Sequence, residues 1–581
     1  MRDELRLLLP SFRAGAPMIA AGLAALVLVD GLQLVVPWVM KRAVDELAAG
    51  QATGQRLAFH GLAVMALATG IGLLRYVWRV CLLGHARRVE QTLRDQLFAH
   101  FLTLSPAFYD RTSAGDLMAH TTNDLESVRM AVGMGMVALV DALLMGTAAT
   151  AMMIAISPTL AAIAVLPMPA LVILAKSLTR QLHRSYRLVQ EAFSLITERV
   201  RESLAGIRMV RAYGLEGAEV ERLAAVSLSS VAANLRRARL SSFFMPLASF
   251  FSQLSTALVL LLGGRLVLAG GISLGDFVAF TGYLALLTWP MMAAGWLMSL
   301  LQRGSASLGR LQVLLSTRPT LADRPAAARA LPAAGPGAIT LEHVSFAYAG
   351  REALALNDLS ITVPAGRITA LVGRTGAGKS TVCHLLARFY DPTAGAVFLD
   401  GQDLRDLPLA ALRSRIGYVP QDTVLFSGTV RENLAFGDPV ADDDGLWAVL
   451  EEAGILEEVR RLPAGLDTRI GERGITLSGG QKQRLAIARA LLTKAPVLVL
   501  DDALSAVDAE TEQHITRRIL AQARGRTFVI VTHRPAAIEQ ADQIVVLDAG
   551  RKVASGSHAE LAASCPLYRQ IYQGGPRHVQ P

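Results

Sequence analysis

The fold of the C-terminal half is decided by the stretch Gly373-Arg374-Thr375-Gly376-Ala377-Gly378-Lys379-Ser380-Thr381. It has the spacing G-x-x-x-x-G-K-[ST] of a phosphate-binding loop, in which glycines allow successive backbone N–H groups to converge on phosphates at a helix start. The motif predicts that Lys379 pairs with the β- and γ-phosphates of a nucleotide and that Ser380 ligates Mg²⁺. By itself the loop indicates only a nucleotide-binding protein.

A second motif further along the chain narrows the class to one family. It is the octapeptide Leu477-Ser478-Gly479-Gly480-Gln481-Lys482-Gln483-Arg484. At this stretch the sequence resembles the ATP-binding cassette (ABC) family, in which L-S-G-G-Q is the signature that covers the γ-phosphate of ATP held by another cassette. The resemblance implies an α/β P-loop NTPase domain that binds ATP and Mg²⁺ and works as one of a pair.

The remaining cassette motifs follow in the order that the family has. Tyr348 comes after the strand-like run Ile339–Phe346, where the family places an aromatic ring that stacks on adenine. Gln421 matches the glutamine that senses Mg²⁺ and the attacking water. Three more polar residues match the second Mg²⁺ ligand, the contact with the other cassette and the γ-phosphate switch: Asp501, Asp508 and His533. Each of these five residues has an ordinary structural explanation by itself, but five matches in the family's order, together with the signature, make that explanation improbable.

The resemblance therefore implies three groups of site residues. Those expected to contact nucleotide are Tyr348, Gly373, Arg374, Thr375, Gly376, Ala377, Gly378, Lys379, Ser380, Thr381 and, in the site of a partner, Ser478, Gly479, Gly480, Gln481 and Asp508. Those expected to ligate Mg²⁺ are Ser380, Gln421 and Asp501. Those expected to act in catalysis are Gln421, Asp502 and His533.

One residue departs from the family pattern. The family normally has a glutamate after Asp501, which orients and polarises the hydrolytic water, whereas this chain has Asp502. A side chain one methylene shorter retracts its carboxylate by roughly an ångström, and such a misplacement can cost on the order of 100-fold in rate. The reference pKa values of Asp and Glu differ by only about half a unit, so geometry matters more than acidity. The chain's own site is predicted to bind ATP well and to hydrolyse it poorly.

The intact signature and the altered Asp502 together favour an asymmetric dimer. The combination resembles the degenerate-site subunit of heterodimeric, multidrug-type ABC exporters, which have one weak and one competent ATP site. We therefore expect a sister half-transporter with a glutamate at the corresponding position, whose site is completed by the signature of this chain. The alternative is a homodimer in which aspartate suffices.

The first half of the chain is predicted to lie in a membrane. A mean hydropathy of +0.39 and a hydrophobic content of 52% exceed what soluble domains usually show. Runs of residues long enough to cross about 30 Å of hydrocarbon occur six times. The predicted spans are Ala16–Met40, Leu57–Leu74, Val132–Ile156, Leu160–Ala175, Phe243–Leu268 and Phe277–Leu301. The fourth is short and contains Pro167 and Pro169, so we expect it to continue past Lys176.

Two long connections, after the second and the fourth span, are rich in arginine and compatible with helix. The positive-inside rule places both in the cytoplasm. Folded as a helical hairpin, the second connection would form arms about 50 Å long. At the tips of the connections we expect short helices that dock on the cassettes, within Ser105–Leu117 and Gly206–Val220. The stretch Gly471-Glu472-Arg473-Gly474 matches the exporter-typical loop that contacts such tips.

The chain is thus expected to consist of a helical transmembrane domain (1–316) that begins with an interfacial elbow helix, a linker rich in Pro, Ala and Gly (317–337), a cassette (338–573) and a short tail (574–581). The net charge of +9 fits attraction to the anionic cytoplasmic leaflet. The sequence has no basic patch interleaved with aromatic residues, so nucleic-acid binding is not indicated. Cys81, Cys383 and Cys565 share no C-x-x-C spacing, so neither a disulfide framework nor a zinc site is indicated.

Four polar or aromatic residues in the spans bear on the cargo. Asp30 and Asp141 lie inside apolar runs, where a central carboxylate costs about 2.5 to 3.5 kcal/mol, so both must face protein or water. We favour an interhelical hydrogen-bonding role over an acidic cavity for cationic cargo. Trp289 and Trp296 are on one face of the sixth span, where a stacking wall for planar amphiphiles and ordinary bundle packing are equally good explanations.

The function that the sequence predicts is ATP-driven transport by alternating access, with export of hydrophobic or amphipathic compounds (drugs, lipids or peptides) across a bacterial cytoplasmic membrane. Two rival classes stay open. An importer of metal–siderophore chelates can have the same exporter-like fold, and a regulatory protein could bind ATP without productive turnover.

Overall fold

The computed structural model describes residues 2–321, 323, 337–351, 353–471, 477–503 and 525–574. The chain forms two compact units: Met1–Ala99 with Leu117–Ser316, and His100–Asp116 with Thr317–Pro581. The first is the helical unit and the second is the cassette unit, to which the segment 100–116 is joined. The linker and the tail predicted from the sequence lie mostly outside the described residues.

The helical unit begins with α1 (Arg2–Ala14), where the elbow helix was predicted, and each predicted span is mostly helical, although the fourth is interrupted. The helices are α2 (Ala16–Ala48), α3 (Gly54–Trp78), α4 (Gly84–Thr103), α7 (Leu125–Val132), α8 (Met134–Ile156), α9 (Pro158–Val165), α10 (Met168–Ala205), α11 (Ile207–Ala212), α12 (Glu216–Ser242), α13 (Phe244–Leu268) and α14 (Leu274–Ser316). Among the described residues, four helical stretches are long and apolar enough to cross a membrane: Ala16–Ala48, Gly54–Thr103, Ala114–Ile156 and Ser249–Leu268.

The structure refines the sequence-based prediction in three places. The fourth span is divided into α9 and α10 at Leu166 and Pro167, because proline disfavours helix continuation. Single π-helical turns interrupt the long connection between the second and third predicted spans at Arg79–Leu83 (η1) and His120–Asp124 (η2), which hydrophobic periodicity did not indicate. The expected docking helix within Ser105–Leu117 is two short helices instead: α5 (Pro106–Tyr109) and α6 (Ala114–Ala119).

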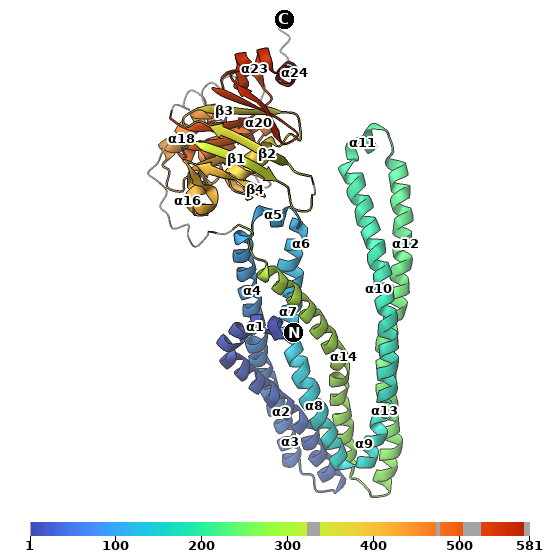
Figure 1. Ribbon diagram of the computed structural model, residues 1–581. Coiled ribbons are helices and arrows are strands. Elements are labelled where there is room, and N and C mark those ends of the chain that lie inside the picture. Colours follow the sequence, from blue (N-terminus) through green and yellow to red (C-terminus); the bar gives the residue numbers. More distant parts are fainter. Residues whose placement is uncertain are drawn as a thin grey trace. The chain divides into compact units, whose positions relative to one another are not determined.

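The second arginine-rich connection forms the predicted helical hairpin. Figure 1 shows α10 and α12 side by side, with the short helix α11 at the tip. The turn after α11 is possible because Gly214 has a φ of +63°, a left-handed backbone that glycine adopts without steric cost. On the arms, Glu219 of α12 accepts hydrogen bonds from Arg199 (3.1 Å) and Ser203 (2.7 Å) of α10, which hold the two helices together.

Polar contacts join α2 to α14 at the end of α2 that follows the first span. Lys41 Nζ lies 2.5 Å from Asp276 Oδ1, and the backbone N–H of Gly275 donates to Asp45 Oδ1 at 2.8 Å. A Cβ at Gly275 would meet the carbonyl oxygen of Lys41 at 2.3 Å, so the two helices approach as closely as glycine allows. Tyr283 of α14, which is 2% exposed, donates to the carbonyl of Leu34 at 3.1 Å.

The cassette contains two main sheets. The first has the order β2-β1-β4-β5 and consists of β1 (Ile339–Phe346), β2 (Leu356–Val363), β4 (Ala394–Leu399) and β5 (Gln402–Asp403). The second has the order β12-β11-β3-β10-β9-β6 and consists of β3 (Ile368–Gly373), β6 (Ile416–Val419), β9 (Val497–Asp501), β10 (Thr527–Val531), β11 (Gln543–Asp548) and β12 (Arg551–Gly556). All neighbours in the second sheet are parallel except β11 and β12.

The second sheet lies between two hydrophobic clusters, one on each of its faces. Along β3, Ala370 and Val372 belong to one hydrophobic cluster and Leu371 to the other, as expected for side chains that alternate between the two faces of a strand. The described helices around the sheets are α15 (Lys379–Leu386), α16 (Leu409–Ser414), α17 (Val430–Ala435), α18 (Asp443–Glu452), α19 (Leu456–Arg460), α20 (Gly479–Leu492), α22 (Pro535–Glu539), α23 (His558–Ser564) and α24 (Pro566–Gly574). The parallel strands end at one edge, where β3 leads into the phosphate-binding loop.

Candidate nucleotide-binding site

The phosphate-binding loop connects the end of β3 at Gly373 to the start of α15 at Lys379. Its tight path requires glycine at two points, since Gly376 and Gly378 have φ angles of +82° and +95°. At Gly378 a Cβ would also meet Leu356 Cδ2 at 2.6 Å and the Ala355 carbonyl oxygen at 2.8 Å. The backbone N–H groups at the start of α15 are thus available to anionic oxygens, which the helix dipole also favours.

Lys379 is held over this loop by the loop itself. Its Nζ donates to the carbonyl oxygens of Gly373 (2.8 Å) and Arg374 (2.9 Å), and the residue is 8% exposed. Burial lowers the pKa of Lys379, while the carboxylates of Asp502 and Asp501 act in the opposite direction. An ammonium group fixed above converging N–H groups is the arrangement that phosphate oxygens require.

A hydroxyl and a carboxylate meet beside the loop. Ser380 Oγ donates to Asp501 Oδ1 at 2.9 Å, and Asp501 is 2% exposed at the end of β9. Burial raises the pKa of Asp501, and the hydrogen bond from Ser380 opposes that effect. Gln421, which follows β6, lines the same cavity. Hydroxyl, carboxylate and amide oxygens are the hard ligands that Mg²⁺ takes together with water and phosphate, so the donor set fits this ion.

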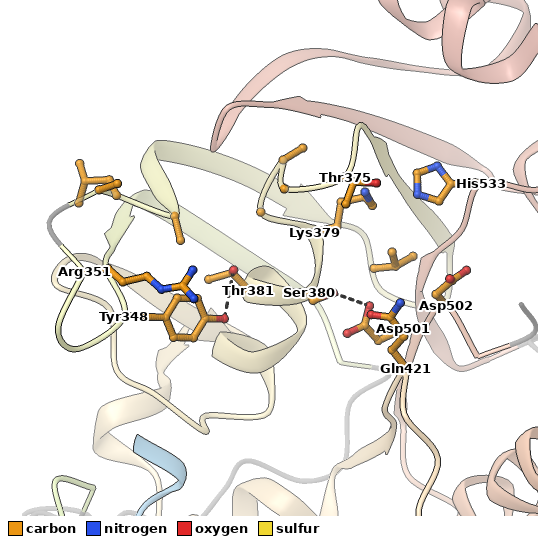
Figure 2. A pocket seen from close by; sticks show the side chains of 17 residues that line it. Tyr348, Arg351, Thr375, Lys379, Ser380, Thr381, Gln421, Asp501, Asp502 and His533 are labelled. Atoms are coloured by element: carbon orange, nitrogen blue, oxygen red, sulfur yellow. Dashed lines mark hydrogen bonds between the residues drawn. The ribbon is translucent and has the colours of Figure 1, made fainter. Parts of the chain in front are cut away.

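A cavity of about 440 Å³ brings most of the predicted residues together. Figure 2 shows Tyr348 at one end, Lys379 and Ser380 in the middle, and Gln421, Asp502 and His533 at the opposite end. The predicted residues that line it are Tyr348, Thr375, Gly376, Ala377, Gly378, Lys379, Ser380, Thr381, Gln421, Asp501, Asp502 and His533. Gly373 and Arg374 belong to the loop without lining the cavity. The shape, elongated from an aromatic ring to a polar end, suits a nucleotide.

Comparisons with known proteins agree with this geometry. Residues 19–291 match the model of the ABC transporter transmembrane region, and residues 356–505 match that of the ABC transporter cassette. The chain belongs to the ABC transporter family. It is a half-transporter, with one helical transmembrane domain followed by one α/β cassette, and an ATPase whose activity is coupled to transport.

Curated relatives match nearly the whole ABC half-transporter. It is 38% identical to the probable multidrug resistance ABC transporter ATP-binding/permease protein YheI of Bacillus subtilis, over 94% of this chain and 93% of the relative. It is also 38% identical to the multidrug resistance-like ATP-binding protein MdlA of Escherichia coli, over 95% and 93%. A solved bacterial Atm1-family ABC exporter with ATP bound superposes with a TM-score of 0.80 at 28% identity, covering 97% of this chain and 99% of that one.

Asp502 of the ABC half-transporter occupies an unusual backbone position. Its φ is +46°, in the left-handed region that Asp and Asn tolerate better than longer side chains, and its N–H donates to Val531 O at 3.0 Å. Burial raises the pKa of Asp502, while His533, Arg534 and Lys379 lower it. Burial also lowers the pKa of His533, an effect that Lys379 strengthens and Asp502 opposes. The two predicted catalytic residues therefore act on each other electrostatically.

The signature is separate from this cavity. Ser478 caps α20 through a reciprocal capping box: its N–H donates to Gln481 Oε1 (2.9 Å), and the Gln481 N–H donates to Ser478 Oγ (3.3 Å). Ser478 and Gly479 are exposed, and none of Ser478, Gly479, Gly480 and Gln481 lines the cavity. Asp508 and the stretch 472–476 lie outside the described residues. The predicted contacts of all these residues with a partner's nucleotide stay predictions.

Five residues that line the cavity were missed by sequence reasoning. Arg351, Ala353, Leu354 and Ala355 line it from the loop between β1 and β2, and Val531 lines it from the end of β10. None belongs to a motif with a fixed residue type. The one available signal was position, because the loop directly follows Tyr348 and Val531 precedes His533 by two residues.

Proposed function

We propose that this chain is one half of a dimeric exporter, driven by ATP, that moves hydrophobic or amphipathic compounds out of the cytoplasm by alternating access. The observation that carries the proposal is the cavity that unites Tyr348, Lys379, Asp501 and His533 on a chain with a helical membrane domain. The direction and the compound class are supported by the multidrug resistance names of the 38%-identical relatives and by the likeness to a solved exporter.

The cavity suggests a role for each group of residues. Tyr348 would stack on the adenine base, and Lys379 with the loop N–H groups would neutralise the phosphates. Ser380, Gln421 and Asp501 would hold Mg²⁺, which neutralises charge on the transferring phosphoryl group when it is bound. Asp502, supported by His533, would accept a hydrogen bond from the attacking water and orient it. The protein's part is thus positioning and electrostatics, as is usual for phosphoryl transfer.

The partner that we propose is a sister chain. The Asp502 carboxylate is one methylene shorter than that of the glutamate expected here, so it holds a water less closely to the γ-phosphate. The signature residues line no part of this chain's cavity, which supports a role in the site of another cassette. A multidrug efflux ATP-binding/permease protein of Mycobacterium tuberculosis is 38% identical over 94% of this chain, yet this chain covers 45% of it. A coverage of just under half is expected where two half-transporters are fused in one polypeptide.

Transport in inverted membrane vesicles tests the function. Vesicles that contain the chain with its partner should accumulate the fluorescent amphipathic cation ethidium when Mg²⁺ and ATP are added, and should accumulate none when Lys379→Ala replaces the wild type. ATP-dependent loss of preloaded ethidium from the same vesicles would show import and contradict the proposed direction.

ATPase measurements on purified protein test the asymmetric dimer. We expect the chain alone to form few active dimers and hydrolyse ATP slowly, and the co-purified pair to hydrolyse it at least about tenfold faster. Brisk, cooperative hydrolysis by the chain alone in lipid nanodiscs would instead show that a homodimer with aspartate at 502 suffices.

A further inference from the structure

The hydroxyl of Tyr348 is held by two polar partners. Its hydroxyl lies 3.2 Å from Thr381 Oγ1 and 3.0 Å from His384 Nδ1, both on α15. Burial lowers the pKa of His384, which favours the neutral imidazole whose nitrogen can accept the phenol's hydrogen. The residue proposed to contact the base is therefore oriented by the helix that begins at the phosphate-binding loop.

A second tyrosine packs against the first. The rings of Tyr390 and Tyr348 form an edge-to-face pair with centroids 5.4 Å apart and planes at 82°, and the ring centroid of Phe346 lies 4.9 Å from that of Tyr348 and 5.4 Å from that of Tyr390. Edge-to-face pairs of this kind depend on the relative orientation of the rings. Tyr348 thus cannot tilt or shift without disturbing Tyr390.

Tyr390 in turn holds a loop that comes from the helical half of the sequence. Its hydroxyl donates to Asp110 Oδ2 at 2.7 Å, a charge-assisted bond, and Asp110 follows α5 directly. Burial, together with the bond to Asp110, raises the pKa of Tyr390, which keeps the phenol protonated as a donor. The same loop is tied down at its other end, where Ser105 Oγ accepts from the Leu321 N–H at 3.0 Å.

We propose that Tyr390 is a positioning residue that transmits occupancy of the base site from Tyr348 to Asp110, and so orders the segment 100–116, which includes α5 and which we call the docking loop. The inference rests on the proposed contact between Tyr348 and a nucleotide base. Two contacts connect Tyr348 to the loop: the Tyr348–Tyr390 ring pair and the Tyr390–Asp110 hydrogen bond. A ligand that fills the phosphate loop but has no base would leave this route unused.

Hydrogen–deuterium exchange of the full-length chain with its partner in nanodiscs tests the route. Mg²⁺-free ATP, which is not hydrolysed, should slow amide exchange in residues 100–116 by about fivefold, the effect of strengthening one hydrogen bond. Saturating tripolyphosphate, checked by displacement of a fluorescent ATP analogue, should leave exchange unchanged. Equal protection by tripolyphosphate would show that the loop responds to phosphates and would overturn the inference.

Variants of Tyr390 and Asp110, with a control at Tyr572, distinguish an effect on this route from a general loss of protein stability. Tyr390→Phe keeps the ring pair but removes the donor, so it should bind ATP with unchanged affinity while loop protection disappears. The matched control is Tyr572→Phe, which removes another tyrosine–carboxylate hydrogen bond, to Glu539, and should keep the protection. Asp110→Asn, which retains an acceptor oxygen, should keep most of it even if Tyr390→Phe fails to fold.

The outcomes distinguish this inference from the proposed function. Full protection in Tyr390→Phe, or its complete loss in Asp110→Asn and Tyr572→Phe alike, would contradict the route. Failure of the wild type to bind ATP would contradict the proposed function itself. Normal ATP binding without any change in loop exchange would overturn only the inference.

Discussion

The two functional faces of the cassette are built in opposite ways. On the phosphate-loop face, Lys379 and Asp501 are buried and each has hydrogen-bond partners within the chain. On the signature face, Ser478 and Gly479 are exposed, and the bonds of Ser478 within α20 only cap the helix. The first face is organised to hold a ligand unaided. On the signature face the capping box fixes the backbone, whereas Ser478 and Gly479 stay exposed to solvent. Such exposure is what we expect of residues that complete a partner's site.

The largest effect should come from the phosphate-loop face. Lys379→Ala removes a buried cation that is held above the phosphate loop, so affinity for ATP should fall at least about 100-fold. Lys482→Ala, which changes a lysine of α20 beyond the signature, is the control and should bind ATP normally. Displacement of a fluorescent ATP analogue measures both. Equal affinities for the two variants would remove the distinction between the faces.

The next effect concerns the signature face. Ser478→Arg should lower turnover of the complex by at least about tenfold, because the bulky cation obstructs the partner's γ-phosphate, while ATP still binds to this chain's own cavity. Ser564→Arg adds the same charge at an exposed position of α23 and should be neutral. Steady-state ATPase assays with parallel binding measurements check this. Loss of ATP binding to the chain's own cavity would show that the two faces are not independent.

A smaller effect should come from the residue that departs from the family pattern. Asp502→Glu should raise turnover severalfold by bringing the carboxylate closer to the water, although its left-handed backbone costs the longer residue about 1 kcal/mol of stability. Asp502→Asn should lower turnover of the complex less than Ser478→Arg does. The ATPase rate of the three variants ranks them, and equal harm from Asp502→Asn and Ser478→Arg would contradict the asymmetric assignment.

The smallest effect is a difference in pH dependence between the faces. Burial raises the pKa of Asp502, so the carboxylate becomes neutral, and asparagine-like, at a higher pH than an exposed aspartate does. The ratio of wild-type to Asp502→Asn turnover should therefore shrink as pH falls from about 8 to about 5. Ser478–Gln481 contains no titratable group, so the effect of Ser478→Arg should be independent of pH. A constant ratio for both variants would mean that the charge of Asp502 does not matter.

The same contrast explains how much could be predicted from sequence. Residues set by a fixed local spacing, from Thr375 to Thr381, were predicted and line the cavity. Gln421, Asp501 and His533 were also predicted, from their match to the family's motifs, and the parallel strands bring them to one edge of the sheet. The contribution of Arg351 was missed because its loop has no required residue type. The left-handed backbone of Asp502 was missed because it depends on the bond to Val531, which is distant in sequence.

In the helical unit, hydrophobic length predicted where helices occur but not how they are interrupted. The π-helical turns at 79–83 and 120–124 lie within continuous helical patterns, so periodicity could not reveal them. Asp30 is 5% exposed, as its place in an apolar run required, yet its Oδ2 is without a hydrogen-bond partner among the described residues. Asp141 Oδ1 is likewise buried without a hydrogen-bond partner among the described residues, so the interhelical role that the sequence favoured stays a prediction. Pairings between helices depend on how the helices pack, which residue spacing does not encode.

The close approach at Gly275 has a consequence for engineering the transporter. Because Lys41 and Asp45 of α2 already touch the backbone and side chain that begin α14, one added methyl group at position 275 would act as a wedge between the first and last spans. Gly275→Ala would therefore push the first and last spans apart where α2 ends and α14 begins. The substitution offers a way to shift the conformational equilibrium of the transmembrane helices without changing any residue of the nucleotide-binding cavity.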